Sequence, residues 1–371
     1  MNNLVKKQVA LAGGLNVRQV NDAARSTPII AKLALGDVVQ LADGVSLPGK
    51  TTAYDFGLVV LPDGRAGWCA LAIDGAQSFR DPVAPPAPKK KHKIGVHVVQ
   101  GGSQDNYIQF ARDMKAAGVP LAGATVVNEW KTANALIDLV NGPVIYRWDP
   151  TGNDKPDWSS MPTASAAYSA GAAWVQARLP DYAKVSKRCF IQATNEPGYS
   201  PIDYAWWQGV MDALRGAGYL AAIFADATGN PDGDDFQNKW KGRIPALVQA
   251  KREGHIVVYH TYSAKGTPPG QMTAGPALAF NEMRFKTVWD QLPESARALV
   301  ALGEAASEHD TGKFQGIDEC VNFATTQDGL IMPLDYVLFE ALWTLGDMEP
   351  WRDCSIDSAL PALGAALRRY L

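Results

Sequence analysis

From residue 94 onward one pattern repeats, an apolar run that predicts a strand followed by a stretch that predicts a helix. This alternation constrains the fold most, because strands separated by helices pair in parallel and the helices then cover the sheet. Eight such strands in about 278 residues fit a closed (β/α)8 barrel, usually about 250 residues long. The predicted strands are Ile94–Val99, Ala124–Val127, Pro143–Trp148, Cys189–Ala193, Leu220–Ala225, Ile256–His260, Ala298–Gly303 and Tyr336–Trp343.

The helices between these strands carry start and stop signals. Ser103 is a suitable N-cap, apolar residues follow at helical spacing, and Gly118 ends the stretch. A second helix is predicted from Ser200 to Gly218, with Pro201 in its first turn. Residues 357–371 are expected to form the eighth helix of the barrel.

A linker divides the chain. Residues 81–93 read DPVAPPAPKKKHK, and proline-rich sequence without apolar periodicity favours an extended spacer. We therefore predict a domain over residues 1–80, a linker over 81–93 and the barrel over 94–371. In the first domain short apolar runs alternate with Gly, Asp and Pro, which predicts a small all-β barrel.

The small domain resembles a bacterial SH3 domain over residues 8–80. The resemblance rests on Gly14-Leu15-Asn16-Val17-Arg18 near the start, on a P-I-I-x-x-L-x-x-G-D-x-V core over residues 28–39, and on a late Gly67-Trp68. Members of that family commonly bind cell-wall peptides or glycans, so the resemblance implies such a ligand. A stabilising barrel without a ligand is the alternative that the residues leave open.

Two glutamates stand where barrel strands are predicted to end. Glu196 lies in Asn195-Glu196-Pro197 after the fourth strand, and Glu304 directly follows the seventh. Catalytic side chains of (β/α)8 barrels gather at the carboxyl ends of the strands. A pair of carboxyl groups is what glycoside hydrolysis needs, one to protonate the leaving oxygen and one to attack or stabilise the sugar.

These motifs resemble those of the clan A retaining glycoside hydrolases. The resemblance implies that Glu196 is the acid/base, that Glu304 is the nucleophile, and that Asn195 contacts the sugar 2-hydroxyl. His260-Thr261-Tyr262 on strand six matches the H-x-Y motif of the clan, and Trp343 near the end of strand eight matches its sugar platform. His260 and Tyr262 share one face because strand side chains alternate.

The chain departs from the clan at one position. An arginine usually follows strand two, where this sequence has Asn128-Glu129-Trp130, and the nearest arginine is Arg147 on strand three. His97 on strand one either lines the pocket floor or only packs. Two further residues are candidate sugar contacts, Asp226 at the end of strand five and Trp158 in the loop after strand three.

The rest of the composition narrows the function classes. With 35 Lys+Arg against 38 Asp+Glu, nothing predicts binding to nucleic acid or to a membrane. The four cysteines form no CxxC pair and no nucleotide-binding glycine motif precedes a helix, so we expect no metal and no cofactor. The amino terminus lacks a Sec-type apolar region, which predicts a cytoplasmic protein or export by another route, such as phage or injection-particle cargo.

The sequence thus predicts a monomeric glycosidase that acts on a polysaccharide or oligosaccharide. Two alternatives remain. The barrel could be a carbohydrate-binding or scaffold protein that retains the pocket without turnover. The SH3-like domain could instead direct a lytic glycosidase to the cell wall.

Overall fold

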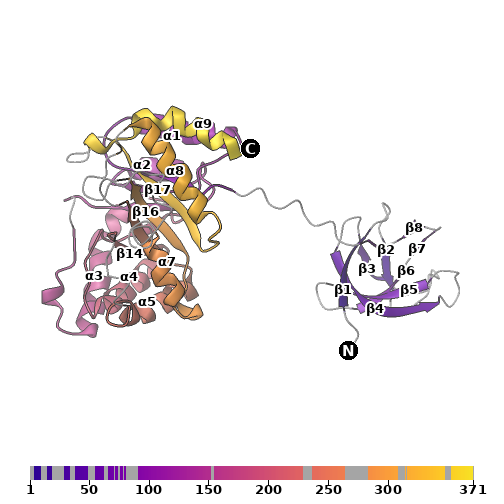
Figure 1. Cartoon of the computed structure of the whole chain (residues 1–371). Coiled ribbons are helices and arrows are strands. Elements are labelled where there is room, and N and C mark those ends of the chain that lie inside the picture. Colours follow the sequence, from indigo (N-terminus) through magenta and orange to yellow (C-terminus); the bar gives the residue numbers. More distant parts are fainter. Residues whose placement is uncertain are drawn as a thin grey trace. The chain divides into compact units, whose positions relative to one another are not determined.

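The computed structural model divides the chain into two compact units, Met1–Pro88 and Lys89–Leu371 (Figure 1). It describes residues 4–9, 15–18, 29–33, 38–48, 55–61, 66–70, 72–73, 76–77, 79–80, 91–151, 154–228, 236–263, 283–307, 314, 316–346 and 352–370. The predicted linker, apart from its last three residues, lies outside these ranges.

The first unit is built from antiparallel strands. One sheet has the order β3-β2-β6-β5-β4-β1-β9, and β7 and β8 form a separate pair. Val59 and Cys69 are fully buried, which places a small apolar core beside β5 and β6. The strands are β1 Leu4–Val9, β2 Leu15–Arg18, β3 Ile29–Leu33, β4 Val38–Pro48, β5 Asp55–Val60, β6 Ala66–Ala70, β7 Ala72–Ile73, β8 Ala76–Gln77 and β9 Phe79–Arg80.

The second unit is a closed barrel of eight parallel strands, β10 to β17 in chain order, as the alternating pattern predicts. Every strand predicted in this part overlaps an observed one. The strands are β10 Ile94–Val98, β11 Ala124–Val127, β12 Val144–Arg147, β13 Phe190–Gln192, β14 Leu220–Asp226, β15 Ile256–Tyr262, β16 Val300–Ala306 and β17 Val337–Leu345.

Helices surround this barrel. In Figure 1, α3, α4, α5 and α7 cover one side, and α1, α2, α8 and α9 cover the other. The described helices are α1 Gln104–Ala116, α2 Trp130–Leu136, α3 Ala164–Tyr182, α4 Asp203–Gly216, α5 Trp240–Glu253, α7 Arg284–Gln291, α8 Ile317–Ile331 and α9 Leu360–Leu367. Short 3-10 turns cover Trp158–Ser160, Glu294–Ala296, Arg352–Cys354, Asp357–Ala359 and Arg368–Tyr370.

The helix ends differ slightly from the prediction. Ser103 occupies the cap of α1, but its side chain makes no capping hydrogen bond, and Gly118 follows in a left-handed conformation. Helix α4 begins at Asp203, so Pro201 precedes it instead of lying in its first turn. The residues from 357 on form α9 with a 3-10 turn at each end.

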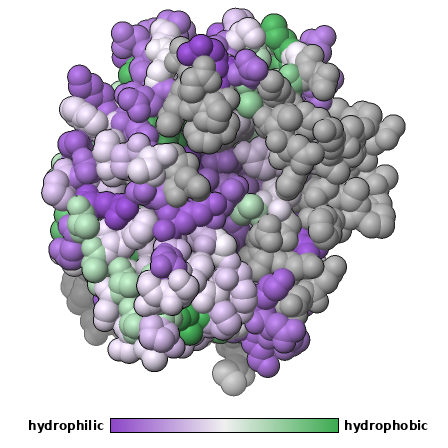
Figure 2. Space-filling view, turned by 90° about the vertical axis from the view of Figure 1, so that its left-hand side faces the viewer, coloured by the Kyte–Doolittle hydropathy of each residue, from purple (hydrophilic) through white to green (hydrophobic). Residues whose placement is uncertain are grey.

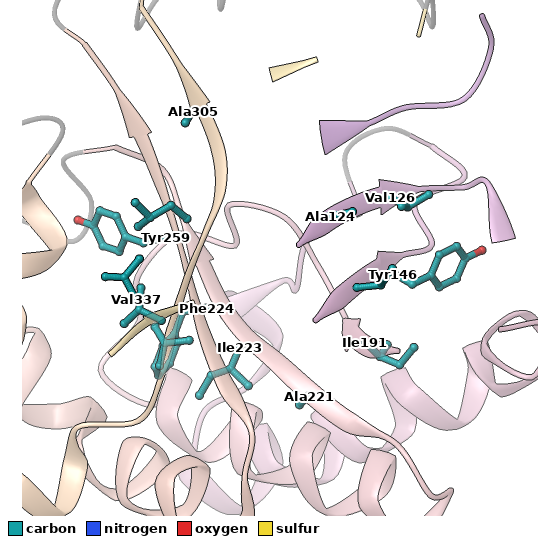
Figure 3. Close-up of a cluster of buried hydrophobic side chains, with 14 of the residues drawn as sticks. Ala124, Val126, Tyr146, Ile191, Ala221, Ile223, Phe224, Tyr259, Ala305 and Val337 are labelled. Atoms are coloured by element: carbon teal, nitrogen blue, oxygen red, sulfur yellow. The ribbon is translucent and has the colours of Figure 1, made fainter. Parts of the chain in front are cut away.

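The core has two layers, because successive strand side chains point to opposite faces. The outer layer combines strand residues with helix residues such as Trp206 and Leu214, so it lies between the barrel and its helices. Figure 3 shows strand residues of this layer, among them Tyr146 and Tyr259. The inner layer holds strand residues such as Val258 and Phe339 and fills the barrel interior toward the amino ends of the strands. The polar residues of the interior lie beyond this layer, toward the carboxyl ends of the strands.

None of the described helices combines the length and the apolar character needed to cross a bilayer. On the face shown in Figure 2, hydrophilic residues spread across the middle and hydrophobic ones are scattered. The large apolar side chains that are exposed lie far apart in the chain; Trp130 begins α2, for example, and Leu299 precedes β16.

Candidate active site

Strand parity brings several polar side chains to the inside of the barrel. In β10 the apolar residues Ile94, Val96 and Val98 belong to the outer layer, so His97 faces inward. By the same alternation Arg147 at the end of β12 and His260 on β15 face inward. These residues are buried despite their polarity, so each needs a hydrogen-bond or charged partner inside the barrel.

A bulge in β16 determines which way the Glu304 side chain points. The sequence suggests that strand seven stops at Gly303, but β16 continues to Ala306 and carries Glu304 within it. The pairing of β15 with β16 shifts here, since Tyr259 opposes Leu302 and His260 opposes Glu304. The additional residue, Gly303, changes the strand parity and turns the Glu304 side chain toward the barrel interior. The expectation that Glu304 follows its strand is therefore corrected: it lies inside the strand.

Glu304 lies in a cage of two hydrogen-bond donors and two histidine rings and is only 4% exposed. Arg147 Nη1 donates to its Oε1 at 3.0 Å, and the Tyr262 hydroxyl donates to its Oε2 at 2.9 Å. His97 Nε2 lies 3.5 Å from Oε1, and His260 Nδ1 lies 3.4 Å from Oε2. Burial alone would raise the pKa of Glu304, but the charges and hydrogen bonds of the histidines and Arg147 outweigh it and hold this pKa well below the ordinary value.

The donors keep the protonation states that this cage needs. Burial lowers the pKa of His97 to about 4, so the ring is neutral at neutral pH. Burial also opposes the charged form of His260, but the Glu304 charge and the hydrogen bond with Glu196 raise the pKa of that ring. Burial and the Glu304 charge hold the pKa of Tyr262 well above its usual value, so its hydroxyl remains a donor.

Glu196 has a different environment. It lies in the loop after β13 with a left-handed backbone, φ 44°, and its N–H donates to the Ala225 carbonyl at 3.1 Å. The side chain is 36% exposed, and its Oε1 lies 3.0 Å from His260 Nδ1. His260 thus bridges the two glutamates, one buried and one facing solvent.

The neighbouring loop residues are held by local hydrogen bonds. Asn195 accepts a hydrogen bond through its Oδ1 from Gln192 Nε2 at 3.0 Å, which turns the amide nitrogen of Asn195 away from Gln192. Thr194 donates to the Asp154 carbonyl at 2.6 Å. Trp158 donates through its ring nitrogen to the Pro197 carbonyl at 2.8 Å, so it braces the loop that carries Glu196.

The carboxyl groups are close together. One oxygen of Glu196 and one of Glu304 lie, with a ring nitrogen of His260, within 4.8 Å of one another. In the part of the chain that is described, this group is compact enough to share a metal ion. However, Arg147 and Tyr262 already donate to the two oxygens of Glu304, and a guanidinium competes directly with a cation there. The set suits two carboxyl groups acting on an organic substrate better than a metal centre.

Trp343, the predicted sugar platform, and the two tryptophans of α4 have different surroundings. Trp343 precedes a cis peptide bond, is 4% exposed and lies with its ring centroid 4.4 Å from that of His97, so it forms inner wall beside the donors of Glu304. Trp206 and Trp207 are both fully buried in the outer layer, packed edge to face at 4.8 Å.

Asp226 is not brought to the site. Its two carboxylate oxygens accept hydrogen bonds from Arg243 of α5, and it is 3% exposed. The β14–β15 pairing shifts between Phe224 and Asp226, which reverses the strand parity and turns Asp226 toward the helices. The prediction that it bonds a sugar hydroxyl is corrected on this ground.

Two residues contribute more than the sequence suggested. The sequence singles out Arg147 only as the arginine nearest to the one missing after strand two, yet Arg147 contacts Glu304. Its position at the end of a predicted strand, on the inward parity, was the signal that could have identified it. His97 also contacts Glu304, which favours the first of its two predicted roles, lining the pocket floor, over packing alone.

Comparisons with known proteins find similar folds only. No family profile matches the chain, and no curated protein matches its sequence. Solved structures that align include a GH128 endo-β-1,3-glucanase from Amycolatopsis mediterranei with laminaritriose, at 15% identity, covering 76% of this chain and 100% of that one, with a TM-score of 0.41. A GH128 exo-β-1,3-glucanase from Aureobasidium namibiae aligns at 14% identity over 72% and 90%, TM-score 0.41. A GH5-4 endoglucanase from Clostridium longisporum aligns at 11% over 76% and 96%, TM-score 0.41. At these identities and TM-scores the similarity says nothing about the activity of this chain.

Proposed function

We propose that this protein is a glycoside hydrolase of the retaining type, with Glu304 as nucleophile and Glu196 as acid/base. One observation carries the proposal. A buried carboxylate held ionised by surrounding donors faces a second, partly exposed carboxyl group within 4.8 Å, oxygen to oxygen. Two carboxyl groups in opposite environments are what the two roles in glycoside cleavage require.

In the first step, Glu304 attacks the anomeric carbon while the bond from that carbon to the leaving oxygen breaks. Glu196 gives its proton to the departing oxygen, so an alcohol leaves and a glycosyl ester forms on Glu304. In the second step, Glu196 takes a proton from water, the water oxygen attacks the anomeric carbon, and Glu304 is released as a carboxylate. Each glutamate ends in its starting state.

The separation of the carboxyl groups favours retention over inversion. Retaining enzymes hold the groups about 5–5.5 Å apart, and inverting enzymes hold them about 6.5–9.5 Å apart to admit water between them. One oxygen of Glu196 lies within 4.8 Å of one oxygen of Glu304, and this close approach supports the shorter class. Arg147 and Tyr262 hold the nucleophile ionised and aligned, and His260 provides a proton-bearing contact between the two glutamates.

The substrate we propose is an oligosaccharide or polysaccharide. The amide of Asn195, oriented by Gln192, supplies a donor for a sugar hydroxyl next to Glu196. Trp343 supplies an apolar wall for the sugar ring beside His97.

We further propose that the first unit is an SH3-like domain that binds a cell-wall glycan or peptide. Support comes from strand pairing: Arg18, in the G-L-N-V-R motif, pairs with Trp68 of the late Gly-Trp motif. Pelleting of the full-length Glu304→Gln variant with purified cell walls tests this. Recovery of the protein in the supernatant contradicts it.

The enzymatic proposal is tested with a panel of 2,4-dinitrophenyl glycosides of common hexoses, pentoses and their disaccharides. We expect wild type to release the aryl group from at least one member, and Glu304→Gln to lose the activity by 10³-fold or more. Glu294→Gln removes an exposed glutamate of a 3-10 turn and is the matched control. A 2-deoxy-2-fluoro glycoside should label Glu304 in wild type, as mass spectrometry of peptides would show.

The outcomes separate the alternatives. Binding of oligosaccharide with equal affinity by wild type and Glu304→Gln, without turnover of any panel member or of cell walls, would establish a carbohydrate-binding barrel instead of an enzyme. Turnover of purified cell walls alone would favour the lytic alternative.

A further inference from the structure

A buried ion triad lies outside the proposed catalytic residues. Arg243 of α5 is 0% exposed and contacts Asp203 at the start of α4 and Asp226 at the end of β14. Its Nε donates to Asp203 Oδ2 at 2.8 Å, and its Nη1 and Nη2 donate to the two oxygens of Asp226. Three charges are thus buried together. Burying ion pairs costs desolvation energy that can exceed their attraction, so stability alone does not account for this triad.

The triad clamps a strained segment. Phe224 and Ala225 both have left-handed backbones, φ 72° and 47°, which cost non-glycine residues about 1–3 kcal/mol each. Such residues persist only when their surroundings fix them. Arg243 holds both sides of the bulge, because its guanidinium carbon lies 4.4 Å from the Phe224 ring centroid and its nitrogens bind Asp226.

The residue between those two anchors supports Glu196. The Ala225 carbonyl accepts the Glu196 N–H at 3.1 Å, and Glu196 is itself left-handed. The loop that carries Glu196 leads directly into α4, whose first residue, Asp203, is the other partner of Arg243. The guanidinium therefore ties together the two segments that determine where the Glu196 backbone lies.

The same strand end supports His260. Thr228, two residues after Asp226, donates to the His260 carbonyl at 3.0 Å and accepts the Tyr262 N–H at 2.9 Å. Movement of the bulge would therefore disturb the ring that lies 3.0 Å from Glu196 as well as Glu196 itself.

We propose that Arg243 is a positioning residue for the acid/base: through the Phe224–Asp226 bulge it fixes the Glu196 carboxyl where the leaving oxygen departs. This inference rests on the glycosidase function proposed above. Arg243 touches no substrate, and its main contribution is to proton donation by Glu196. The attack by Glu304 depends less on it, because Arg147 and His97 contact Glu304 from strands outside the segment that Arg243 clamps.

The test compares two leaving groups on the sugar that wild type cleaves fastest. A 2,4-dinitrophenyl group leaves without protonation, whereas a phenyl group needs the acid. For Arg243→Lys and Asp226→Asn, we expect kcat/KM on the phenyl glycoside to fall at least tenfold, with less than threefold change on the dinitrophenyl glycoside. Leu247→Ala, a buried change one turn further along α5, is the control for lost stability and should leave the ratio unchanged.

The outcomes are distinct. If folded Arg243→Lys and Asp226→Asn lower both rates by the same factor, or change neither, the triad is merely structural and the inference is wrong. Asp226→Asn keeps the side-chain volume and the Arg243–Asp203 contact, so it supplies the ratio even where Arg243→Lys does not fold. If wild type cleaves no glycoside, the proposed function itself fails, a result that the wild-type assay gives before any variant is measured.

Discussion

Tyr262→Phe tests the link between the geometry around Glu304 and catalysis. The change removes one oxygen, the donor that lies 2.9 Å from Glu304 Oε2, and keeps the ring in place. A hydrogen bond to a charged group is worth about 1.5–3 kcal/mol, and 1.36 kcal/mol corresponds to a tenfold rate change. If the bond aligns the nucleophile through the transition state, kcat/KM should fall by about 10- to 150-fold.

The same change has a pH signature. Tyr262 favours the ionised form of Glu304, so its loss should raise the pKa of that carboxyl and move the acid limb of kcat/KM to higher pH. Initial rates on a 2,4-dinitrophenyl glycoside between pH 3 and 8 measure both effects. Tyr146→Phe removes a buried hydroxyl of the outer layer, one without a hydrogen-bond partner among the described residues, and is the matched control. A loss below threefold with an unmoved acid limb would refute the reasoning.

Two further changes probe the barrel itself. Gly209→Ala should destabilise the protein by about 1–3 kcal/mol, because a Cβ there would lie 2.0 Å from the Tyr168 carbonyl oxygen where α3 and α4 meet. In a thermal melt the control Gly242→Ala, whose Cβ meets nothing within 4 Å, should melt at or above wild type, and equal melting of both variants would contradict the packing. Glu340 is buried with no hydrogen-bond partner for either oxygen among the described residues, and burial followed by the charge of Asp328 raises its pKa well above the ordinary value. The folded state thus favours protonated Glu340, so this stabilising contribution is complete at acid pH and is lost as pH rises from the unfolded pKa toward the folded one. Glu340→Gln, a neutral isostere, should therefore raise the melting temperature relative to wild type by a margin that widens from pH 5 to pH 8. A gain of 1 kcal/mol would appear as about 2–4 °C, and a margin that narrows with pH would show that Glu340 is ionised in the folded protein.

The sequence predicted the barrel because the barrel depends on period. Apolar runs of strand length, separated by helical stretches, specify parallel pairing whatever the individual residues are. That is why all eight strands were located, from Ile94 in β10 to Val337 in β17, with errors mainly at their ends. The ends were missed where a polar residue continues a strand. The sequence predicts that strand seven ends at Gly303 with Glu304 directly after it, because it does not reveal that Arg147, from a distant strand, pairs with the charge of Glu304.

The remaining errors have one cause, which is that a bulge changes the face of every residue after it. Strict alternation from Ala301 would turn Glu304 outward, and alternation from Ala222 would turn Asp226 inward. The structure has the reverse in both cases, because a register shift precedes each residue. The local sequence does not predict either register shift. The first is at Gly303, and glycine alone does not specify a bulge; the second is at Phe224 and Ala225, residue types that rarely adopt a left-handed backbone. Arg243 contacts both sides of that second bulge, and its hydrogen bonds join residues 17 and 40 positions apart. Tertiary contacts therefore decide which carboxylates face the barrel interior. Strand period alone locates the strands correctly, but it predicts that Asp226 faces the interior when Asp226 faces the helices.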